Sequence, residues 1–214
     1  MGTKALQAKR RQHMKIKNVI FDIGNVLIDF CWKDHMIALG FSDECIAVLS
    51  EKMINSPLWD ALDMGVRPHE EVIADMKAAA PEYAAQIDEF FGQPMGMVRL
   101  RPQTVPWIRS LKERGCSVYL LSNYPRWLFE LHTPRFEFLP YTDGRVVSSY
   151  INVMKPDPAI YNTLLDKYSL RAEECAFVDD RPVNTEAAEQ LGIRSVVYVD
   201  AEQAKNELDA LLAQ

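Results

Sequence analysis

The chain has 214 residues, 48% of them hydrophobic, which allows one substantial core and a smaller accessory lobe. Its 24 basic and 30 acidic residues give a formal charge of −6, which argues against a nucleic-acid partner. The four cysteines are scattered and form no Cys-x-x-Cys pair, which argues against a zinc site or a disulfide-rich secreted scaffold.

Residues 1–14 are basic, with Lys9, Arg10 and Arg11 in a run, and we expect them to form a disordered tail. No apolar segment follows that would act as a signal sequence. The absence of acidic residues also fits a transit peptide, but such peptides are rich in serine and this tail has none. No apolar run approaches the roughly 20 residues that a membrane span needs. We therefore expect a cytoplasmic protein without a membrane partner.

The first apolar run, residues 19–21, is short and ends at Asp22. Two later runs have the same form, since residues 118–121 end at Ser122 and residues 176–178 end at Asp179. Uninterrupted apolar runs of this length predict buried strands of a parallel sheet. Ligands of such sheets bind beyond the carboxyl ends of the strands, so we expect the site there.

About seventy residues separate the first strand from Pro102, far more than a strand-to-helix connection needs. Their apolar residues recur at helical spacing, with turns near Gly40, residues 65–68 and Pro81, which indicates several short helices. We therefore expect residues 31–99 to form an inserted helical cap, while residues 15–30 and 100–214 form the core. The alternative is that the insertion packs only as additional core.

The second half of the chain alternates helices with strands. Apolar residues recur at helical spacing over residues 105–111 and again over residues 160–165. A further strand is expected at residues 195–199, followed by an amphipathic closing helix at residues 202–212. The pattern predicts an α/β fold with a Rossmann-like parallel sheet.

Four motifs lie in order at strand ends or helix starts: residues 21–27 (FDIGNVL), 121–123 (LSN), 155–158 (KPDP) and 178–184 (VDDRPVN). With these motifs the chain resembles the haloacid dehalogenase (HAD) superfamily over nearly all of residues 17–200. The first motif also looks like the branch that includes α-D-glucose-1-phosphate phosphatases. The resemblance implies a HAD core with a small cap, and a Mg²⁺-dependent phosphatase of a small phosphorylated metabolite such as a sugar phosphate. We expect a monomer or a homodimer.

A phosphoryl group is negatively charged, so a carboxylate attacks it only where cations neutralise both partners. Asp22 is the expected nucleophile, which forms an aspartyl-phosphate and also binds Mg²⁺. Asp180 is expected to provide the second carboxylate ligand, and the family pattern adds the main-chain carbonyl of Gly24. Asp179 is expected to orient Lys155 or a metal-bound water rather than bind the metal, and Asn184 to act likewise.

Lys155 is the expected cation that keeps Asp22 ionised and stabilises charge on the phosphate. The hydroxyl of Ser122 and the backbone amide of Asn123 are expected to donate to a phosphate oxygen. Taken alone, such a lysine is usually solvated, and a Ser-Asn pair is usually a helix cap. The assignments therefore depend on the four motifs occurring together.

The chain departs from the family pattern at one position. Most phosphatases of this superfamily carry an acid–base aspartate two residues after the nucleophile, where this chain has Gly24. General acid–base catalysis is worth roughly 10²- to 10⁴-fold. Three explanations stay open: the leaving group needs little help, as in an anomeric sugar phosphate or an acyl phosphate; another group, such as Asp29 or a cap residue, substitutes; or the protein is a weak catalyst.

Trp32, Trp59 and Asp63 are the candidate cap residues for contact with the substrate, although a tryptophan in a small helical lobe is more often core. Arg126 either faces the pocket or is an exposed helix residue.

Two other functions use the same residues. A hydrolytic 2-haloacid dehalogenase also attacks through the first aspartate and lacks the second, but it needs no metal. The adjacent Asp179 and Asp180 argue against it, because acids around a nucleophile help only when a cation binds there. The other alternative is a non-catalytic protein that binds a phosphorylated metabolite.

Overall fold

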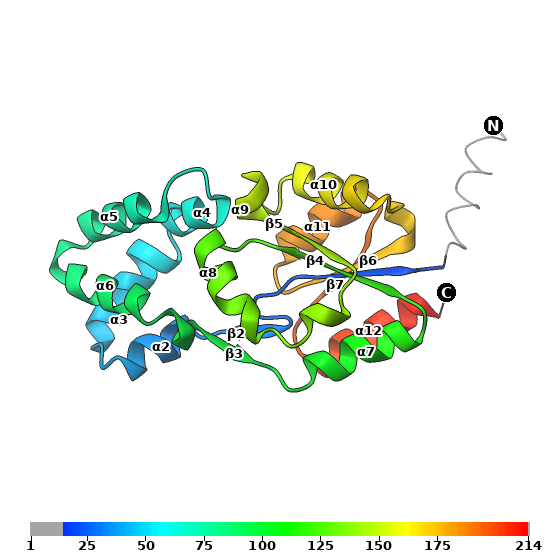
Figure 1. The fold of residues 1–214 in the computed structure, drawn as a ribbon, viewed down its shortest axis with the longest axis horizontal. Helices are drawn as coiled ribbons and strands as arrows, with labels where there is room; N and C mark the ends of the chain where they lie inside the picture. The colour runs from blue at the N-terminus through cyan, green and yellow to red at the C-terminus, as the bar shows by residue number, and fades with distance from the viewer. Residues whose placement is uncertain (1–14, 214) are drawn as a thin grey trace.

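The computed structural model describes residues 15–213, so the expected tail at residues 1–14 lies outside the described residues (Figure 1). Its centre is a five-stranded parallel sheet in the order β5-β4-β1-β6-β7. The strands are β1 (Asn18–Phe21), β4 (Ser117–Ser122), β5 (Gly144–Val147), β6 (Cys175–Asp179) and β7 (Arg194–Val197). This confirms the predicted α/β fold with a Rossmann-like parallel sheet.

β1 is the central strand because it pairs with β4 on one side and with β6 on the other. Phe21 lies opposite Leu120 and Val178, so the three strands end at the same edge. The backbone N–H of Asp22 then donates to the carbonyl of Val178 at 2.9 Å, which continues the ladder one residue past the strand. The nucleophile candidate is therefore held by the sheet itself.

The helices of the core cover both faces of the sheet (Figure 1). Val19 and Phe21 belong to one apolar cluster with residues of α7 (Thr104–Glu113) and α12 (Ala201–Leu212). Ile20 and Phe177 belong to a second cluster with residues of α10 (Pro158–Tyr168) and α11 (Pro182–Gln190). The two clusters follow from the alternation of side chains along a strand.

The remaining core elements lie in the connections after β4, after β5 and before β6. They are α8 (Arg126–His132), α9 (Ser148–Ile151) and three short 3₁₀ turns at Thr133–Arg135, Leu139–Tyr141 and Ala172–Glu174. The α9 turn comes directly after β5, so it lies at the edge of the sheet where Asp22 is found.

The chain between β1 and α7 forms a separate group of helices beside the sheet (Figure 1). They are α2 (Trp32–Ala38), α3 (Asp43–Leu49), a π-helical turn (Ser50–Ile54), α4 (Pro57–Met64), α5 (His69–Ala79) and α6 (Ala84–Gly92), with 3₁₀ turns at Pro81–Tyr83 and Pro94–Met97. Gly40 and Gly65 have φ of 80° and 68°, values that glycine adopts without steric cost. They end α2 and α4.

A two-stranded antiparallel ribbon of β2 (Ile28–Phe30) and β3 (Val98–Leu100) joins this helical group to the sheet. Asp29 accepts from Arg99 at 3.0 Å and from Arg101 at 2.6 Å. Arg101 also donates to the carbonyl of Val26 at 2.9 Å and to the hydroxyl of Tyr198 at 2.7 Å. These contacts fasten the ribbon to the core.

Within residues 15–213, the helices are too short or too polar to cross a membrane.

Candidate functional site

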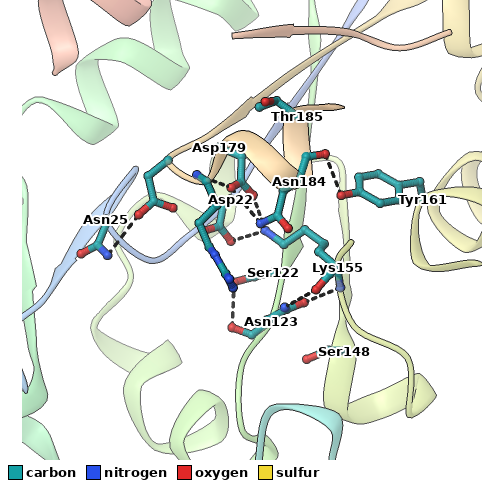
Figure 2. A network of polar contacts seen from close by, with 12 residues as sticks. Asp22, Asn25, Ser122, Asn123, Ser148, Lys155, Tyr161, Asp179, Asn184 and Thr185 are labelled. Atoms are coloured by element: carbon teal, nitrogen blue, oxygen red, sulfur yellow. Dashed lines mark hydrogen bonds and ion pairs between the residues drawn. The ribbon is translucent and has the colours of Figure 1, made fainter. Parts of the chain in front are cut away.

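Five polar side chains meet at the carboxyl edge of the sheet, and Figure 2 labels four of them, Asp22, Ser122, Lys155 and Asp179. Asp22 follows β1, Ser122 ends β4, and Asp179 and Asp180 lie at the end of β6. Lys155 comes from the loop before α10 and reaches the same point. The separate motifs of the sequence thus lie at one place in the fold.

Lys155 lies between two carboxylates. Its ammonium is 2.8 Å from Oδ1 of Asp22 and 2.6 Å from Oδ2 of Asp179, and the residue is only 1% exposed. Asn123 fixes the backbone of Lys155 from both sides, because its Oδ1 accepts from the Lys155 N–H at 2.8 Å and its Nδ2 donates to the Lys155 carbonyl at 3.0 Å. The backbone that carries the Lys155 side chain is therefore fixed in position.

Asp179 is completely buried and hydrogen-bonded through both oxygens. Besides Lys155, it accepts from the backbone N–H of Arg181 and from Nδ2 of Asn184, both at 2.9 Å. The carbonyl of Asn184 accepts from the hydroxyl of Tyr161 at 2.8 Å. This chain of contacts sets the position of Asp179 and, through it, that of Lys155.

Asn25 holds the loop after β1. Its Oδ1 accepts from the N–H of Phe30 at 3.1 Å, and its Nδ2 donates to Oδ2 of Asp180 at 3.3 Å. Its φ of 55° is left-handed, a conformation that asparagine tolerates better than most residues. The sequence analysis did not identify Asn25, although an asparagine after a glycine is a common turn signal.

Burial and crowding disfavour negative charge at this site. Burial raises the pKa of Asp22 to about 6, although the Lys155 ammonium opposes it, and the charges of Asp179 and Asp180 add to the increase. Burial and the neighbouring Asp179 also raise the pKa of Asp180. Burial alone would lower the pKa of Lys155, but Asp179 and Asp22 hold it above its ordinary value. Lys155 therefore keeps its positive charge, whereas the negative charge of the surrounding carboxylates is only partly neutralised.

The residues present fit a divalent cation. One oxygen each of Asp22, Asp179 and Asp180 lie within 4.8 Å of one another, and the Lys155 ammonium pairs with two of these carboxylates, those of Asp22 and Asp179. Oδ1 of Asp22 and Oδ1 of Asn184 are buried without a well-aligned hydrogen bond among the described residues. Carboxylate and carbonyl oxygens are the ligands that Mg²⁺ takes. Since Asp179 already bonds through both oxygens, Asp22 and Asp180 are the carboxylates free to bind a metal.

A cavity of about 160 Å³ opens from this cluster toward the helices between β2 and β3. Its lining includes the site residues Asp22, Gly24, Asn123, Lys155 and Asp180. It also includes apolar side chains, those of Ile28, Phe30, Trp59, Met97, Val98 and Leu128.

Tyr124 and His132 also line the cavity, but they bond to each other. The Tyr124 hydroxyl lies 2.8 Å from Nδ1 of His132, and Nε2 of His132 lies 3.0 Å from the carbonyl of Pro94. Burial lowers the pKa of His132, so the ring is neutral near pH 7. Because the carbonyl only accepts, Nε2 carries the proton and Nδ1 accepts from the tyrosine. The sequence analysis missed both residues, since neither belongs to a motif.

Of the other candidate residues, some line the cavity and others do not. Trp59 and Asp63 line the cavity, whereas Trp32 does not. Asp29 is paired with Arg99 and Arg101, which together lower its pKa against the effect of burial, and it lines a different depression. Arg126 lies outside the cavity, where it donates to the carbonyl of Ser149 at 3.1 Å and stacks on Tyr150. Asp29 is therefore not placed to replace the missing acid.

Residues 16–192 match the family of haloacid dehalogenase-like hydrolases. The chain belongs to this family. It is 27% identical to the sesquiterpene phosphatase astK of Aspergillus oryzae over 92% of this chain and 96% of that protein. It is also 23% identical to the D-ribitol-5-phosphate phosphatase of Bacteroides thetaiotaomicron, over 92% of this chain and 98% of that protein. The match to drimenol cyclase drtB of Aspergillus calidoustus, at 24% identity, spans 36% of that longer protein.

Solved structures of the family have the same fold. A predicted HAD-like hydrolase from Porphyromonas gingivalis superposes with a TM-score of 0.74 at 24% identity, covering 94% of this chain and all of that one. A HAD family enzyme from Bacteroides thetaiotaomicron, in complex with magnesium and inorganic phosphate, gives 0.67 at 21% identity, covering 85% and 93%. At these identities the likeness concerns the fold.

Magnesium should stabilise this hydrolase in the absence of substrate, because it neutralises the excess carboxylate charge. A Mg²⁺ concentration 100-fold above Kd adds about 2.7 kcal/mol to the free energy of unfolding, measurable as a rise in Tm. Asp180→Asn should lose most of this rise, whereas Asp166→Asn, which alters an exposed residue of α10, should keep it. An equal rise in Asp180→Asn and wild type would contradict the assigned ligand.

Lys155→Ala should destabilise the metal-free protein strongly, because it leaves Asp22 and Asp179 buried without a counter-charge. Breaking a buried pair in this way typically costs about 3–5 kcal/mol. Urea denaturation measures the loss. Lys167→Ala, at an exposed position, is the control and should change stability by less than about 0.5 kcal/mol. A Lys155→Ala protein as stable as this control would show that the pair is not a structural element.

Proposed function

We propose that this hydrolase is a Mg²⁺-dependent phosphatase of small phosphorylated metabolites, with Asp22 as its nucleophile. The observation that carries the proposal is the position of Asp22. Its carboxylate lines a cavity, in contact with the buried ammonium of Lys155 and beside two further carboxylates. An anionic substrate needs cations there, and one ammonium among three carboxylates is too few.

Each residue then has a separate task. Lys155 attracts a phosphate oxygen while holding Asp22 in line for attack. Ser122, whose hydroxyl makes only a 3.4 Å contact with the carbonyl of Asn123, is able to turn and donate to the phosphate, as is the backbone N–H of Asn123. Asp22, Asp180 and the carbonyl of Gly24 would hold Mg²⁺, which when bound supplies positive charge to the phosphoryl oxygens.

The reaction proceeds in two steps on Asp22. Its carboxylate oxygen forms a bond to phosphorus as the ester oxygen leaves, which gives an aspartyl-phosphate. Water then attacks this phosphorus, inorganic phosphate leaves, and the carboxylate is restored. Asp179 keeps Lys155 in place through both steps, and Asn184 keeps Asp179 in place.

The alternative functions have weaker support. A dehalogenase gains nothing from the carboxylates of Asp179 and Asp180 around its nucleophile. A non-catalytic binding protein would not need a nucleophile aligned with Lys155. Two relatives that match over nearly the whole chain are phosphatases by name, one of a sesquiterpene and one of D-ribitol 5-phosphate.

The walls of the cavity favour a substrate with an apolar organic group over a sugar. Phe30, Leu128 and Met97 offer no hydrogen bonds to its hydroxyl groups, and Tyr124 and His132 are occupied with each other. A hydroxyl buried against such a wall loses its water partners at a cost of about 1–3 kcal/mol. An alkyl or isoprenoid chain has no such cost.

Wild-type protein should release inorganic phosphate from p-nitrophenyl phosphate when Mg²⁺ is present and should stop when EDTA removes the metal. Asp22→Asn should be inactive under both conditions, because an amide is not a nucleophile for phosphorus. Mass spectrometry of an acid-quenched reaction should find the wild-type chain phosphorylated on Asp22. Metal-independent turnover, or turnover by Asp22→Asn, would overturn the proposal.

Isopentenyl monophosphate should be hydrolysed with a kcat/KM at least about tenfold above that of α-D-glucose 1-phosphate. Burial of its isoprenoid group, which is about the size of a leucine side chain, is worth about 1.5–3 kcal/mol of binding free energy. Trp59→Ala should raise KM for the isoprenoid substrate roughly tenfold. Trp32→Ala, at a tryptophan of the same lobe that lies outside the cavity, is the matched control and should leave KM unchanged. A preference for the sugar phosphate would restore the sugar assignment.

A further inference from the structure

The position of Gly24 leaves the reaction without an acid for the departing ester oxygen. Asp29 is held by two arginines, and Tyr124 and His132 are held by each other. Asp63 is different, because no hydrogen bond or ion pair within residues 15–213 involves its carboxyl group. Yet this side chain is buried, with the residue 9% exposed, and it lines the same cavity as Asp22.

Asp63 reaches the cavity from the helical lobe. It lies in the last turn of α4, whereas Asp22, Lys155 and Asp180 lie at the ends of core elements. The nucleophile and Asp63 therefore bound the cavity from different parts of the fold. A phosphate ester held at Asp22 and Lys155 would extend its organic group toward the lobe, with the ester oxygen on the side of Asp22 that faces the cavity lined by Asp63.

The end of α4 is fastened to the core at a defined point. The hydroxyl of Ser148 donates to the carbonyl of Asp63 in a short hydrogen bond, and the same hydroxyl accepts from the N–H of Tyr124 at 3.0 Å. Asn152 donates to the carbonyl of Met64 at 3.1 Å. Ser148 thus ties the backbone of Asp63 to the loop that carries Asn123.

Gly65 makes this close approach possible. A Cβ at this residue would lie 2.8 Å from Cβ of Ser149 and 2.9 Å from its carbonyl oxygen, and its φ of 68° is left-handed. Only glycine meets both conditions without displacement. The packing of α4 on α9 therefore sets the position of Asp63 relative to the loop that carries Asn123.

The surroundings of Asp63 favour the neutral form of its carboxyl group. Burial raises its pKa well above the ordinary value, and the negative charges of Asp60 and Asp22 raise it further, against the opposing charges of Lys155 and Arg181. A neutral carboxyl group is able to donate a proton, and after donation it becomes a base.

We propose that Asp63 is the acid–base residue of this enzyme and replaces, from the cap, the aspartate that Gly24 lacks. The inference rests on the proposed phosphatase function. In the first step, the Asp63 proton passes to the ester oxygen while the phosphorus–oxygen bond breaks, so the product leaves as a neutral alcohol. In the second step, the Asp63 carboxylate takes a proton from the attacking water, and the oxygen of that water bonds to phosphorus. Both residues end the cycle in their starting states.

The test compares two leaving groups. p-Nitrophenolate is stable without a proton, whereas an alkoxide is not, so only the alkyl ester depends on an acid. In rapid-quench experiments, Asp63→Asn should phosphorylate Asp22 from p-nitrophenyl phosphate within about tenfold of the wild-type rate. From isopentenyl monophosphate, phosphorylation should slow by roughly 10²- to 10⁴-fold. The p-nitrophenol burst should then be followed by slow turnover, because the base for the second step is also missing.

Glu89→Gln is the matched control, since Glu89 lies on α6 of the same lobe and is exposed. This variant should follow wild type with both substrates. Equal slowing of both substrates by Asp63→Asn would assign a structural role to Asp63, and no slowing would exclude any role; either result overturns the inference while leaving Asp22 as nucleophile. If wild type phosphorylates Asp22 from neither ester, the proposed function fails and the inference fails with it.

Discussion

The buried ion pairs of Lys155 with Asp22 and Asp179 are the interactions on which the site depends. Removing an ammonium from water costs several kcal/mol, which only close carboxylates with satisfied hydrogen bonds offset. Here the carboxylates come from two adjacent parallel strands, and the β1–β6 register sets their separation. Asn123 fixes the backbone of Lys155, and Arg181 and Asn184 satisfy the second oxygen of Asp179. Asp22 has no comparable support, which leaves its carboxylate available for chemistry.

The helical lobe contributes the other half of the cavity. The β2–β3 ribbon and the contacts of α4 with α9 attach it to the core at two places. Attachment at two places fixes both the apolar wall around Trp59 and the carboxyl group of Asp63 relative to the nucleophile. In the proposed mechanism, recognition of the organic group and delivery of a proton to it depend on the same lobe.

The sheet and the acidic cluster were predictable because they depend on local patterns. The apolar runs at residues 19–21, 118–121 and 176–178 are buried in β1, β4 and β6, and each polar residue that follows them lies at the same edge. The edge strand β5 was missed because a run of Gly-Arg-Val-Val has only two buried residues. Short edge strands have little apolar periodicity to detect.

Other parts of the site depend on tertiary contacts that no spacing encodes. Asn123 was expected to act through its backbone, but its side chain also holds Lys155, thirty-two positions further along the chain. The bond between Tyr124 and His132 forms only because α8 turns the ring back toward the loop. Asp63 was one of several cap candidates, and only the packing of α4 on α9 separates it from Trp32.

The absence of a side chain at Gly24 in the core bears on the role proposed for the lobe. A side chain at this residue would meet no atom within 4 Å, and its backbone is not left-handed, so packing does not require glycine. The missing side chain instead leaves open space beside Asp22 in the cavity wall. An acid on the loop after β1 would act on any ester that reaches the nucleophile. An acid at Asp63 acts only when the organic group fits against the lobe, so the rate of the first step depends on recognition of the leaving group. The departure from the family pattern at Gly24 is thus consistent with an enzyme whose selectivity and proton transfer both reside in the cap.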